Sequence, residues 1–310
     1  MFKHCFTGDC TTSLRHQTTN KETIMTIQTT DTTIIYRRMS EHDLPAAHTL
    51  SQTMRWPHRL EDWQFVLALG TGFVAEEGSA VIGTSLYWKQ GDRHGSLGMI
   101  IVSPDRQGKG IGRELMNLIL EELGERCTLL IATPAGQPLY ERLGFVATGA
   151  IHQHQGTMTA VAPLALAAGE RIRLAEPDDI ATIIDLANRA TGMSRDAVLK
   201  QLIPMAEIVV LERNGELAGF SIMRRFGRGH AIGPVVAPDS VHAKALIAHW
   251  TDAYAGSFVR VDVTASSGLG AWLAEAGLVQ VDTGVTMARN GVPAQDETVK
   301  QFAILNQALC

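Results

Sequence analysis

The chain has little of what marks several large classes of protein. Its four cysteines have no zinc-like spacing, and three lie near the chain ends, which favours a reducing, cytoplasmic location. No apolar run approaches the length of a membrane span. The net charge is −5 and there is no long basic run, so nucleic acid is not an expected partner. We therefore expect a soluble cytoplasmic protein that binds neither nucleic acid nor a membrane.

The composition is that of an ordinary globular protein. The hydrophobic fraction is 45% and the charged fraction 19%, and 310 residues are enough for two domains. Residues 1–32 are rich in threonine, show little apolar periodicity and lack the uninterrupted apolar stretch of a secretory signal. We predict that they form a disordered tail.

A glycine-rich loop between a strand and a helix organises the first half of the sequence. Met99–Val102 is an apolar run typical of a buried strand, and Glu114–Leu123 has the apolar spacing of a helix. Between them stand Gly108, Gly110 and Gly112. Glycines allow close backbone approach, and the first turn of a helix offers unpaired N–H groups, so this order predicts phosphate binding.

The spacing of the loop separates it from two common phosphate loops. Lys109 is followed by glycine and not by serine or threonine, which excludes a Walker A loop. Neither possible start of a G-x-G-x-x-G fingerprint has glycine at the last position, which argues against a dinucleotide oxidoreductase. The remaining pattern, Gln107-x-x-Gly110-x-Gly112, resembles the pyrophosphate loop of the GNAT superfamily of N-acetyltransferases. An ordinary glycine turn that caps a helix is the alternative.

A second motif and the order of elements extend this resemblance over Ile34–Val161. Leu139–Phe145 is similar to the family motif in which a tyrosine, here Tyr140, precedes a Gly-Phe pair. The expected elements are a strand at 34–38, helices at 40–50 and 60–69, strands at 72–77, 80–89, 96–102 and 127–132, a short helix at 137–142, and two strands at 145–151 and 156–161. The asparagine that the family often has after the fifth strand is absent, since Ala132 is followed by threonine and proline.

The second half of the sequence repeats the first at an offset of about 135 residues. Val102–Asp105 is echoed by Val236–Asp239, but no glycine loop follows the second copy. Tyr140 is replaced by Leu273. This arrangement resembles tandem members of the superfamily with a degenerate C-terminal GNAT-like domain.

The sequence thus predicts an α+β (mixed α/β) protein of two tandem domains, each a mostly antiparallel sheet flanked by helices. The expected organisation is a tail at 1–32, a catalytic domain at 33–165, a linker at 166–170, a degenerate domain at 171–290 and a C-terminal tail or helix at 291–310.

The resemblance implies an N-acetyltransferase that uses acetyl-CoA as cosubstrate, without a metal, and acts on the primary amine of a small molecule. The expected cofactor-binding residues are Ile100, Ile101 and Val102 through the backbone, and Gln107, Gly108, Lys109, Gly110, Ile111, Gly112 and Arg113 at the diphosphate. Tyr140 is the expected acid that protonates the leaving thiolate, and a tyrosine of the core is the alternative. No general base is assigned. An acyl-CoA-binding sensor or scaffold without turnover is the alternative function, and a homodimer is left open.

Two further groups are candidates for the acceptor side of the site. Arg55, His58 and Arg59 fall in the segment that covers the acceptor in the family, and their charge suggests a carboxylate or phosphate on the acceptor; solvated surface charges are the alternative. His152 and His154 share one face of a strand and line the acceptor side or the surface. A metal site there lacks a third ligand at suggestive spacing.

Overall fold

The computed structural model describes residues 33–310, and the predicted tail at 1–32 lies outside the described residues. The first half (residues 33–157) contains β1 (Ile34–Arg38), α1 (Leu44–Thr53), α2 (Leu60–Leu69), β2 (Thr71–Glu77), β3 (Ala80–Gln90), β4 (His94–Val102), α3 (Ile111–Leu123), β5 (Cys127–Ala132), α4 (Gln137–Arg142) and β6 (Val146–Thr157). The second half (residues 170–299) contains β7 (Glu170–Leu174), α5 (Ile180–Thr191), α6 (Asp196–Leu202), β8 (Ala206–Arg213), β9 (Glu216–Phe226), β10 (Gly229–Ala237), α7 (Ser240–Ala253), β11 (Phe258–Thr264), α8 (Gly270–Glu275) and β12 (Val279–Arg289). The C-terminal segment (residues 300–310) contains β13 (Lys300–Ala303). No helix among residues 33–310 is long and apolar enough to cross a membrane.

The two halves begin with the same electrostatic arrangement. Arg37 donates to both carboxylate oxygens of Asp43 at 2.9 and 2.8 Å, and Arg173 does the same to Asp179 at 2.6 and 3.0 Å. Each aspartate also accepts a hydrogen bond from the backbone N–H three residues earlier, at 2.8 and 2.7 Å. Each pair therefore fixes the path of the chain from its first strand into its first helix.

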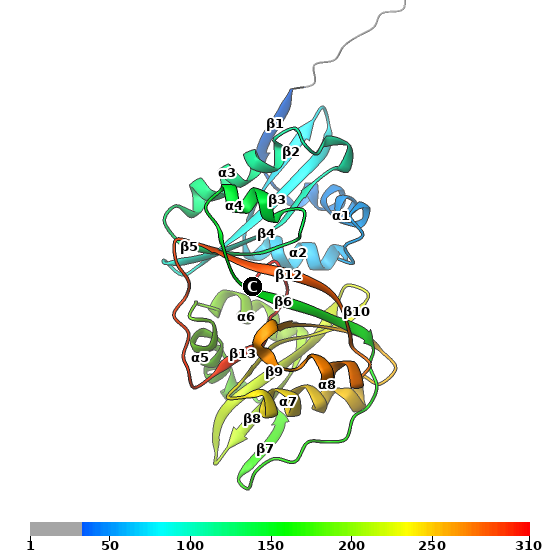
Figure 1. The fold of residues 1–310 in the computed structure, drawn as a ribbon, viewed down its shortest axis with the longest axis vertical. Helices are drawn as coiled ribbons and strands as arrows, with labels where there is room; N and C mark the ends of the chain where they lie inside the picture. The colour runs from blue at the N-terminus through cyan, green and yellow to red at the C-terminus, as the bar shows by residue number, and fades with distance from the viewer. Residues whose placement is uncertain (1–32) are drawn as a thin grey trace, which may run out of the picture. The chain divides into compact units, whose positions relative to one another are not determined.

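The sheets of the two halves exchange a strand and become one continuous sheet. Its order is β1-β2-β3-β4-β5-β12-β6-β11-β13-β10-β9-β8-β7. The prediction of two closing strands at 145–151 and 156–161 is wrong, because one long strand, β6, spans Val146–Thr157 and pairs with β12 and β11 of the second half. In turn β12 pairs with β5 of the first half, and Figure 1 shows it beside β6. Neither half closes its own sheet edge, so each needs the other.

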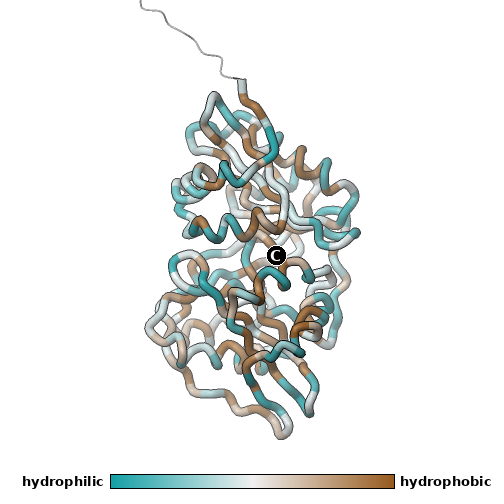
Figure 2. The backbone as a smooth tube through the Cα atoms, turned by 180° about the vertical axis from the view of Figure 1, so that it is seen from behind, coloured by the Kyte–Doolittle hydropathy of each residue, from teal (hydrophilic) through white to brown (hydrophobic). Residues whose placement is uncertain are grey.

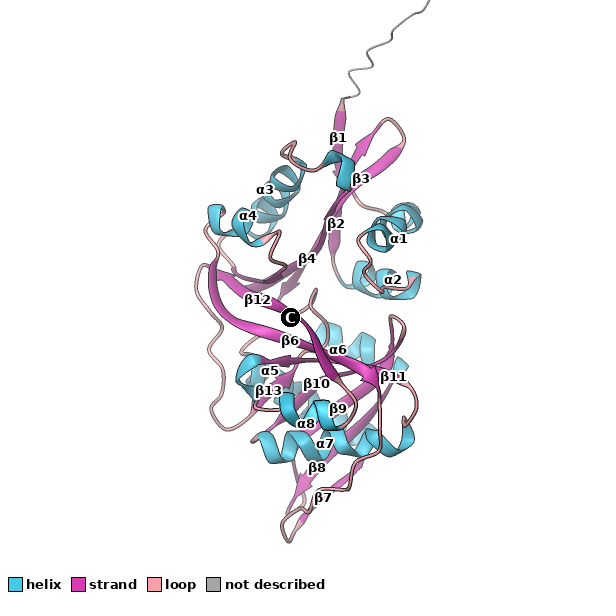
Figure 3. Cartoon of the chain, turned by 45° about the vertical axis from the view of Figure 1, so that its right-hand side comes forward, coloured by secondary structure: helices cyan, strands magenta, loops and turns pink. Residues whose placement is uncertain are grey.

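A shared hydrophobic core joins the halves on one face of this sheet. Helices α1 and α2 lie on the opposite face of the first half from α3 and α4 (Figure 3). One continuous cluster of buried side chains contains Trp63 of α2, Leu186 of α5, Leu202 of α6 and Leu305 of the C-terminal segment. Separate clusters lie under α3 and under α7. Figure 2 shows hydrophobic stretches within both halves.

The C-terminal segment adds a strand to the sheet and is not the tail or helix that the sequence predicts. β13 pairs antiparallel with β10 and meets β11 at Val263. The following residues reach the first half, where the carbonyl oxygen of Leu309 accepts hydrogen bonds from Gln90 at 3.3 Å and from the buried Arg195 at 3.0 Å. A Cβ at Gly98 of β4 would lie only 2.9 Å from the Cα of Ala308. The segment therefore connects the second half to β4.

Substitutions at two glycines of β6 test how closely the exchanged strand packs against its neighbours. A Cβ at Gly156 would overlap the carbonyl oxygen of Gly277, next to β12, whereas a Cβ at Gly149 would meet nothing within 4 Å. We expect Gly156→Ala to lower the free energy of unfolding by about 1–3 kcal/mol, because backbone must move to admit the methyl group. Gly149→Ala is the matched control and should leave stability within about 0.5 kcal/mol. Urea unfolding of both variants measures this, and equal stabilities would contradict the close approach.

Candidate functional site

Strands β4 and β5 separate shortly after they begin, and this separation forms the site. They pair in parallel only from His94 to Ser96 of β4. Farther along β4 the pairing with β3 is irregular: Met99 has a φ of +53°, and its carbonyl oxygen accepts a hydrogen bond from the buried Thr84 hydroxyl at 2.9 Å. The β5-facing edge of β4 after Ser96 thus has no ladder partner on β5 among the described residues. An extended ligand can pair with such an edge.

A cavity of about 370 Å³ opens at this separation. From the first half it is lined by Arg55, Trp56, Pro57, His58, Leu97, Gly98, Met99, Ile100, Leu130, Ile131, Thr133, Tyr140, Gln153 and Gln155; from the second half by Phe226, Arg228, Arg260, Val281 and Asp282; and from the C-terminal segment by Gln307 and Ala308. Of the β4 residues predicted to bind the cofactor, Ile100 lines the cavity. Ile101 is buried in the core and, with Val102, lies in the pairing with β3.

Tyr140 lies in the cavity wall, on the short helix α4. Its ring packs edge-to-face on Phe145, with 6.2 Å between ring centroids, and the residue is 8% exposed. Burial raises the pKa of Tyr140 to about 12. The phenol is therefore protonated at neutral pH and holds a proton that it can donate.

The glycine loop forms an open N-terminus for α3. Gly108 and Gly110 have φ angles of +77° and +84°, a region that favours glycine, and Gly110 directly precedes the first helical residue, Ile111. No side chain of residues 33–310 caps this helix. Lys109 and Arg113 are exposed beside it. Gln107 donates to the carbonyl oxygen of Val102 at 3.1 Å and so connects the loop to β4.

The first-turn N–H groups of α3 are therefore open to an anion, with no competing side chain among residues 33–310, and the helix dipole favours negative charge at the same point. Gly112 differs from the other two loop glycines. Its φ is not positive, and a Cβ there would make ordinary contacts at 3.6 Å with Leu139.

In the second half, two features block the positions that correspond to the α3 N-terminus and to the free edge of β4. The carboxylate of Asp239 caps α7 by accepting hydrogen bonds from the N–H groups of Val241 at 2.9 Å and His242 at 3.0 Å. β13 pairs with β10 from Val235 to Ala237, which is where β4 of the first half has its free edge. Leu273, in place of the tyrosine, is fully buried. The second half has the fold of the first, but among the described residues β10, the counterpart of β4, has no free edge at this place and α7, the counterpart of α3, has no free N-terminus.

Several residues of the cavity carry no signal in the sequence. Phe226, Arg228 and Arg260 come from strands and turns of the second half, and Asp282 from the exchanged strand β12. None belongs to a motif, so only the tertiary structure could find them. Gln307 reaches the cavity because the C-terminal segment crosses from β13 to β4.

Only some of the residues predicted for the acceptor side line the cavity. Arg55 and His58 line the cavity, whereas Arg59 does not and forms a salt bridge with Asp62 at 2.8 Å. Nδ1 of His154 lies 3.0 Å from the carbonyl oxygen of Leu278, and His152 is absent from the cavity wall. Within residues 33–310 there is no group of three histidine, cysteine, aspartate or glutamate side chains that could hold a metal ion.

His58 is a second residue of the cavity wall whose pKa is shifted. Its ring makes edge contacts with Trp56 and Phe226 at centroid distances of 5.8 and 5.6 Å, and its Nδ1 is buried with no hydrogen-bond partner in residues 33–310. Burial, and next the nearby Arg260 guanidinium, lower the pKa of His58 to about 4. The imidazole is therefore neutral at physiological pH.

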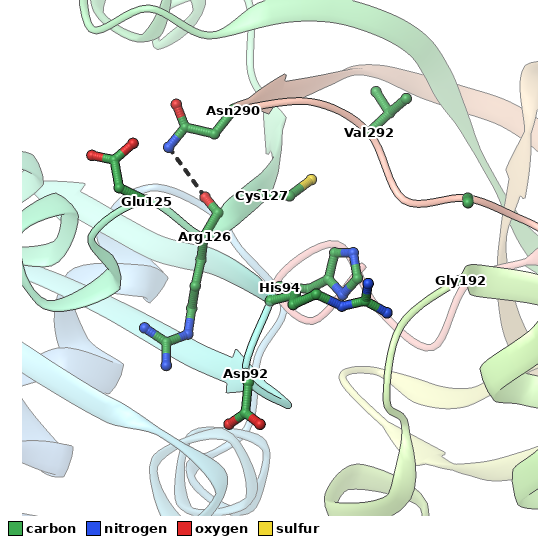
Figure 4. A pocket seen from close by; sticks show the side chains of 10 residues that line it. Asp92, His94, Glu125, Arg126, Cys127, Gly192, Asn290 and Val292 are labelled. Carbon is green, nitrogen blue, oxygen red and sulfur yellow. Dashed lines mark hydrogen bonds between the residues drawn. The ribbon is translucent and has the colours of Figure 1, made fainter.

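A second pocket, of about 610 Å³, lies where β4 and β5 begin (Figure 4). Its wall carries charges of both signs, including Asp92, Arg93 and Glu125, and Asn290 donates to the carbonyl oxygen of Arg126 at 3.3 Å. Its wall lacks Tyr140 and adjoins the paired part of β4 and β5, and residues 107–113 of the glycine loop line neither this pocket nor the cavity of about 370 Å³. The candidate site is therefore the cavity at the other end of these strands.

Fold and site together define a two-domain protein with one open ligand site and one closed copy of it. Models of the acetyltransferase (GNAT) family and of an acetyltransferase (GNAT) domain match residues 36–145 and 183–303. The chain belongs to the GNAT acetyltransferase family and contains two GNAT domains in tandem.

Relatives and solved structures agree with this assignment. The chain is 28% identical over 173 residues to an uncharacterized N-acetyltransferase, YitH, of Bacillus subtilis. This alignment covers 54% of this chain and 60% of that protein. It is 32% identical over 141 residues to mycothiol acetyltransferase of Frankia alni, covering 39% and 42%. These alignments span about 60% or less of each relative.

The similar structures share the fold at low identity. A putative acetyltransferase of Pyrococcus horikoshii has a TM-score of 0.72 at 19% identity, over 89% of this chain and 96% of that one. A tandem GNAT protein of the clavulanic acid biosynthesis pathway has a TM-score of 0.62 at 14% identity, over 85% and 100%. Such likeness supports the tandem architecture.

The low pKa of His58 predicts a pH-dependent stability. The unfolded imidazole takes up a proton below about pH 6.5, but the folded one only near pH 4, so protonation favours the unfolded chain between these values. The free energy of unfolding should therefore fall as the pH drops, by about 2 kcal/mol from pH 7 to pH 5 for this group alone. His58→Gln should remove that part of the slope in urea unfolding, while His42→Gln, at an exposed histidine, should keep it. An unchanged slope in His58→Gln would show that the pKa of His58 is not lowered in the folded protein.

Proposed function

We propose that the first half transfers the acetyl group of acetyl-CoA to a primary amine of a small molecule. The observation that carries this is the coincidence of a free β4 edge, an uncapped glycine-loop helix terminus and a buried, protonated Tyr140 in the same half. The second half has lost all three. The family assignment supports acyl transfer, and these residues support acetyl-CoA as the donor.

The chain fits such a donor at two places. The N–H groups at the start of α3, with Lys109 and Arg113 beside them, suit a diphosphate. The unpaired backbone of β4 around Ile100 suits the amide groups of an extended pantetheine arm, which would add to the sheet as a strand does. A bound donor supplies a thioester whose carbonyl carbon is open to attack.

The acetyl transfer needs no reactant other than the amine and the thioester. The neutral amine nitrogen attacks the thioester carbonyl carbon, a C–N bond forms, and the C–S bond breaks. The phenol of Tyr140 gives its proton to the leaving sulfur, while the amine nitrogen loses a proton to water, which restores the phenol. The products are an amide and a free thiol. The raised pKa of Tyr140 means that the phenol carries its proton at neutral pH, before the thiolate develops.

Tyr140→Phe separates catalysis from binding. The ring can still pack on Phe145, but the proton donor is lost, and a positioned acid contributes roughly 10²–10⁴-fold to the rate. We expect kcat to fall by about that factor and the affinity for acetyl-CoA to stay unchanged, as measured by thiol release and by calorimetry. Full turnover at neutral pH would remove Tyr140 from this role.

Gly110→Val tests the placement of the donor. A β-branched residue is strained at a φ of +84°, so the loop should change shape and the affinity for acetyl-CoA should fall about tenfold or more. Val241→Ala, at the corresponding helix terminus in the second half, is the control and should bind as the parent does. Normal binding by Gly110→Val would contradict a diphosphate at α3.

Thiol release from acetyl-CoA with a panel of small amines decides between an enzyme and a sensor. Release that depends on both the amine and Tyr140 supports the transferase. Tight acetyl-CoA binding without release on any amine would support an acyl-CoA-binding module instead.

A further inference from the structure

The second half of the chain supplies one wall of the cavity through the turn between β9 and β10. The N–H of Gly227 donates to the buried carboxylate of Asp62 at 3.0 Å, and Arg59 donates to the carbonyl oxygen of Arg225 at 3.3 Å. Phe226 packs on His58 at 5.6 Å. These contacts hold the turn against the α1–α2 loop, so Arg228 and Arg55 come to line the same cavity from opposite halves.

The arginines around this wall fall into two groups. Arg59 is paired with Asp62 at 2.8 Å, and Arg260 with Asp262 at 2.7 Å. Arg55 and Arg228 form no salt bridge within residues 33–310; both are exposed and line the cavity, and the Arg228 guanidinium lies 4.8 Å from the centroid of the Phe258 ring, a contact that leaves its charge without an anionic partner. Their charges are therefore available to a ligand, whereas those of the paired arginines are satisfied by the fold.

The cavity wall also holds a carboxylate that no cation of residues 33–310 satisfies. Asp282 on β12 is exposed, and its Oδ1 accepts only the neighbouring N–H of Thr283, at 2.8 Å. Two unpaired guanidiniums and one unpaired carboxylate thus line one cavity of about 370 Å³. A small amine with no other charge would find a partner for its ammonium but would meet two uncompensated positive charges.

We infer that the acceptor is a small amine that also carries an anionic group, a carboxylate or a phosphate, which Arg55 and Arg228 bind while Asp282 attracts the ammonium. This inference rests on the proposed acetyl transfer and adds the substrate class. It also gives the second half a function: the half that has lost its own site contributes a specificity residue to the other. Guanidiniums suit both anions because their donors match the oxygens of either.

Matched amine pairs test the class directly. With acetyl-CoA and full-length protein, initial rates of thiol release are compared for 3-aminopropanoate and 3-aminopropanamide, and for aminoethyl phosphate and ethanolamine. We expect KM for the anionic member of at least one pair to be lower by roughly tenfold or more. The pair with the larger ratio identifies carboxylate or phosphate. Equal KM values within both pairs would overturn the inference.

Single-residue variants then show which residues cause the difference in KM between the anionic and the neutral amine. Arg55→Gln and Arg228→Gln should each raise KM for the preferred anionic amine by roughly five- to tenfold and leave its neutral partner unchanged. Arg225→Gln is the matched control, since it removes an exposed charge at the end of β9, next to the same turn but outside the cavity wall. Asp282→Asn should raise KM for both members of a pair. Equal effects of the arginine variants on both members would overturn the assignment.

The failure of the proposed function is distinguishable from the failure of this inference. Turnover without preference for anionic amines leaves acetyl transfer standing and removes the anion site. If no amine gives thiol release, calorimetric titration of the same pairs decides: tighter binding of the anionic member, lost in Arg228→Gln, supports the site, and equal binding overturns it.

Discussion

The reciprocal pairing of β6 and β12 is the constraint on which the rest of the structure depends. Each of these strands leaves its own half and completes hydrogen-bond ladders in the other, so the open edge of β5 is covered by a strand that begins more than 120 residues later. A sheet edge left without a partner would expose unpaired N–H and C=O groups. The halves therefore cannot separate without breaking backbone pairing, and the hydrophobic cluster shared by α1, α2, α5 and α6 adds to that coupling.

This coupling explains why a site built on the first half is walled by the second. β12 brings Asp282 to the cavity, and the docked β9–β10 turn brings Phe226 and Arg228. Rigid docking of this turn follows from Asp62, a buried carboxylate that accepts from Arg59 and from the backbone of Gly227. A buried charge with several partners in fixed directions holds the two halves in one arrangement.

The two copies show how one fold can gain or lose a site with few changes. In the first half glycines turn the chain into α3 and leave its N–H groups free; in the second a single side chain, Asp239, satisfies the same groups of α7. The free edge of β4 has its counterpart in β10, which β13 covers. In the second half, Asp239 and β13 thus occupy the backbone hydrogen-bonding groups that the first half leaves free for a ligand. With these backbone groups paired inside the chain, the second half acts as a scaffold.

Local patterns in the sequence determined the elements, the glycine loop, the place of Tyr140 and the repeat, because apolar periodicity, glycine at positive φ and capping residues act over a few residues. The same patterns predicted that the second copy lacks a phosphate loop. The strand exchange, the position of the C-terminal segment and the roles of Arg228 and Asp282 were decided only by the tertiary structure. Strand partners are chosen by hydrogen bonding between segments far apart in the chain. The paired or unpaired state of a charge depends on which neighbours the fold brings to it: Arg55 and Arg59 stand four positions apart, yet within residues 33–310 only Arg59 of these two reaches a carboxylate.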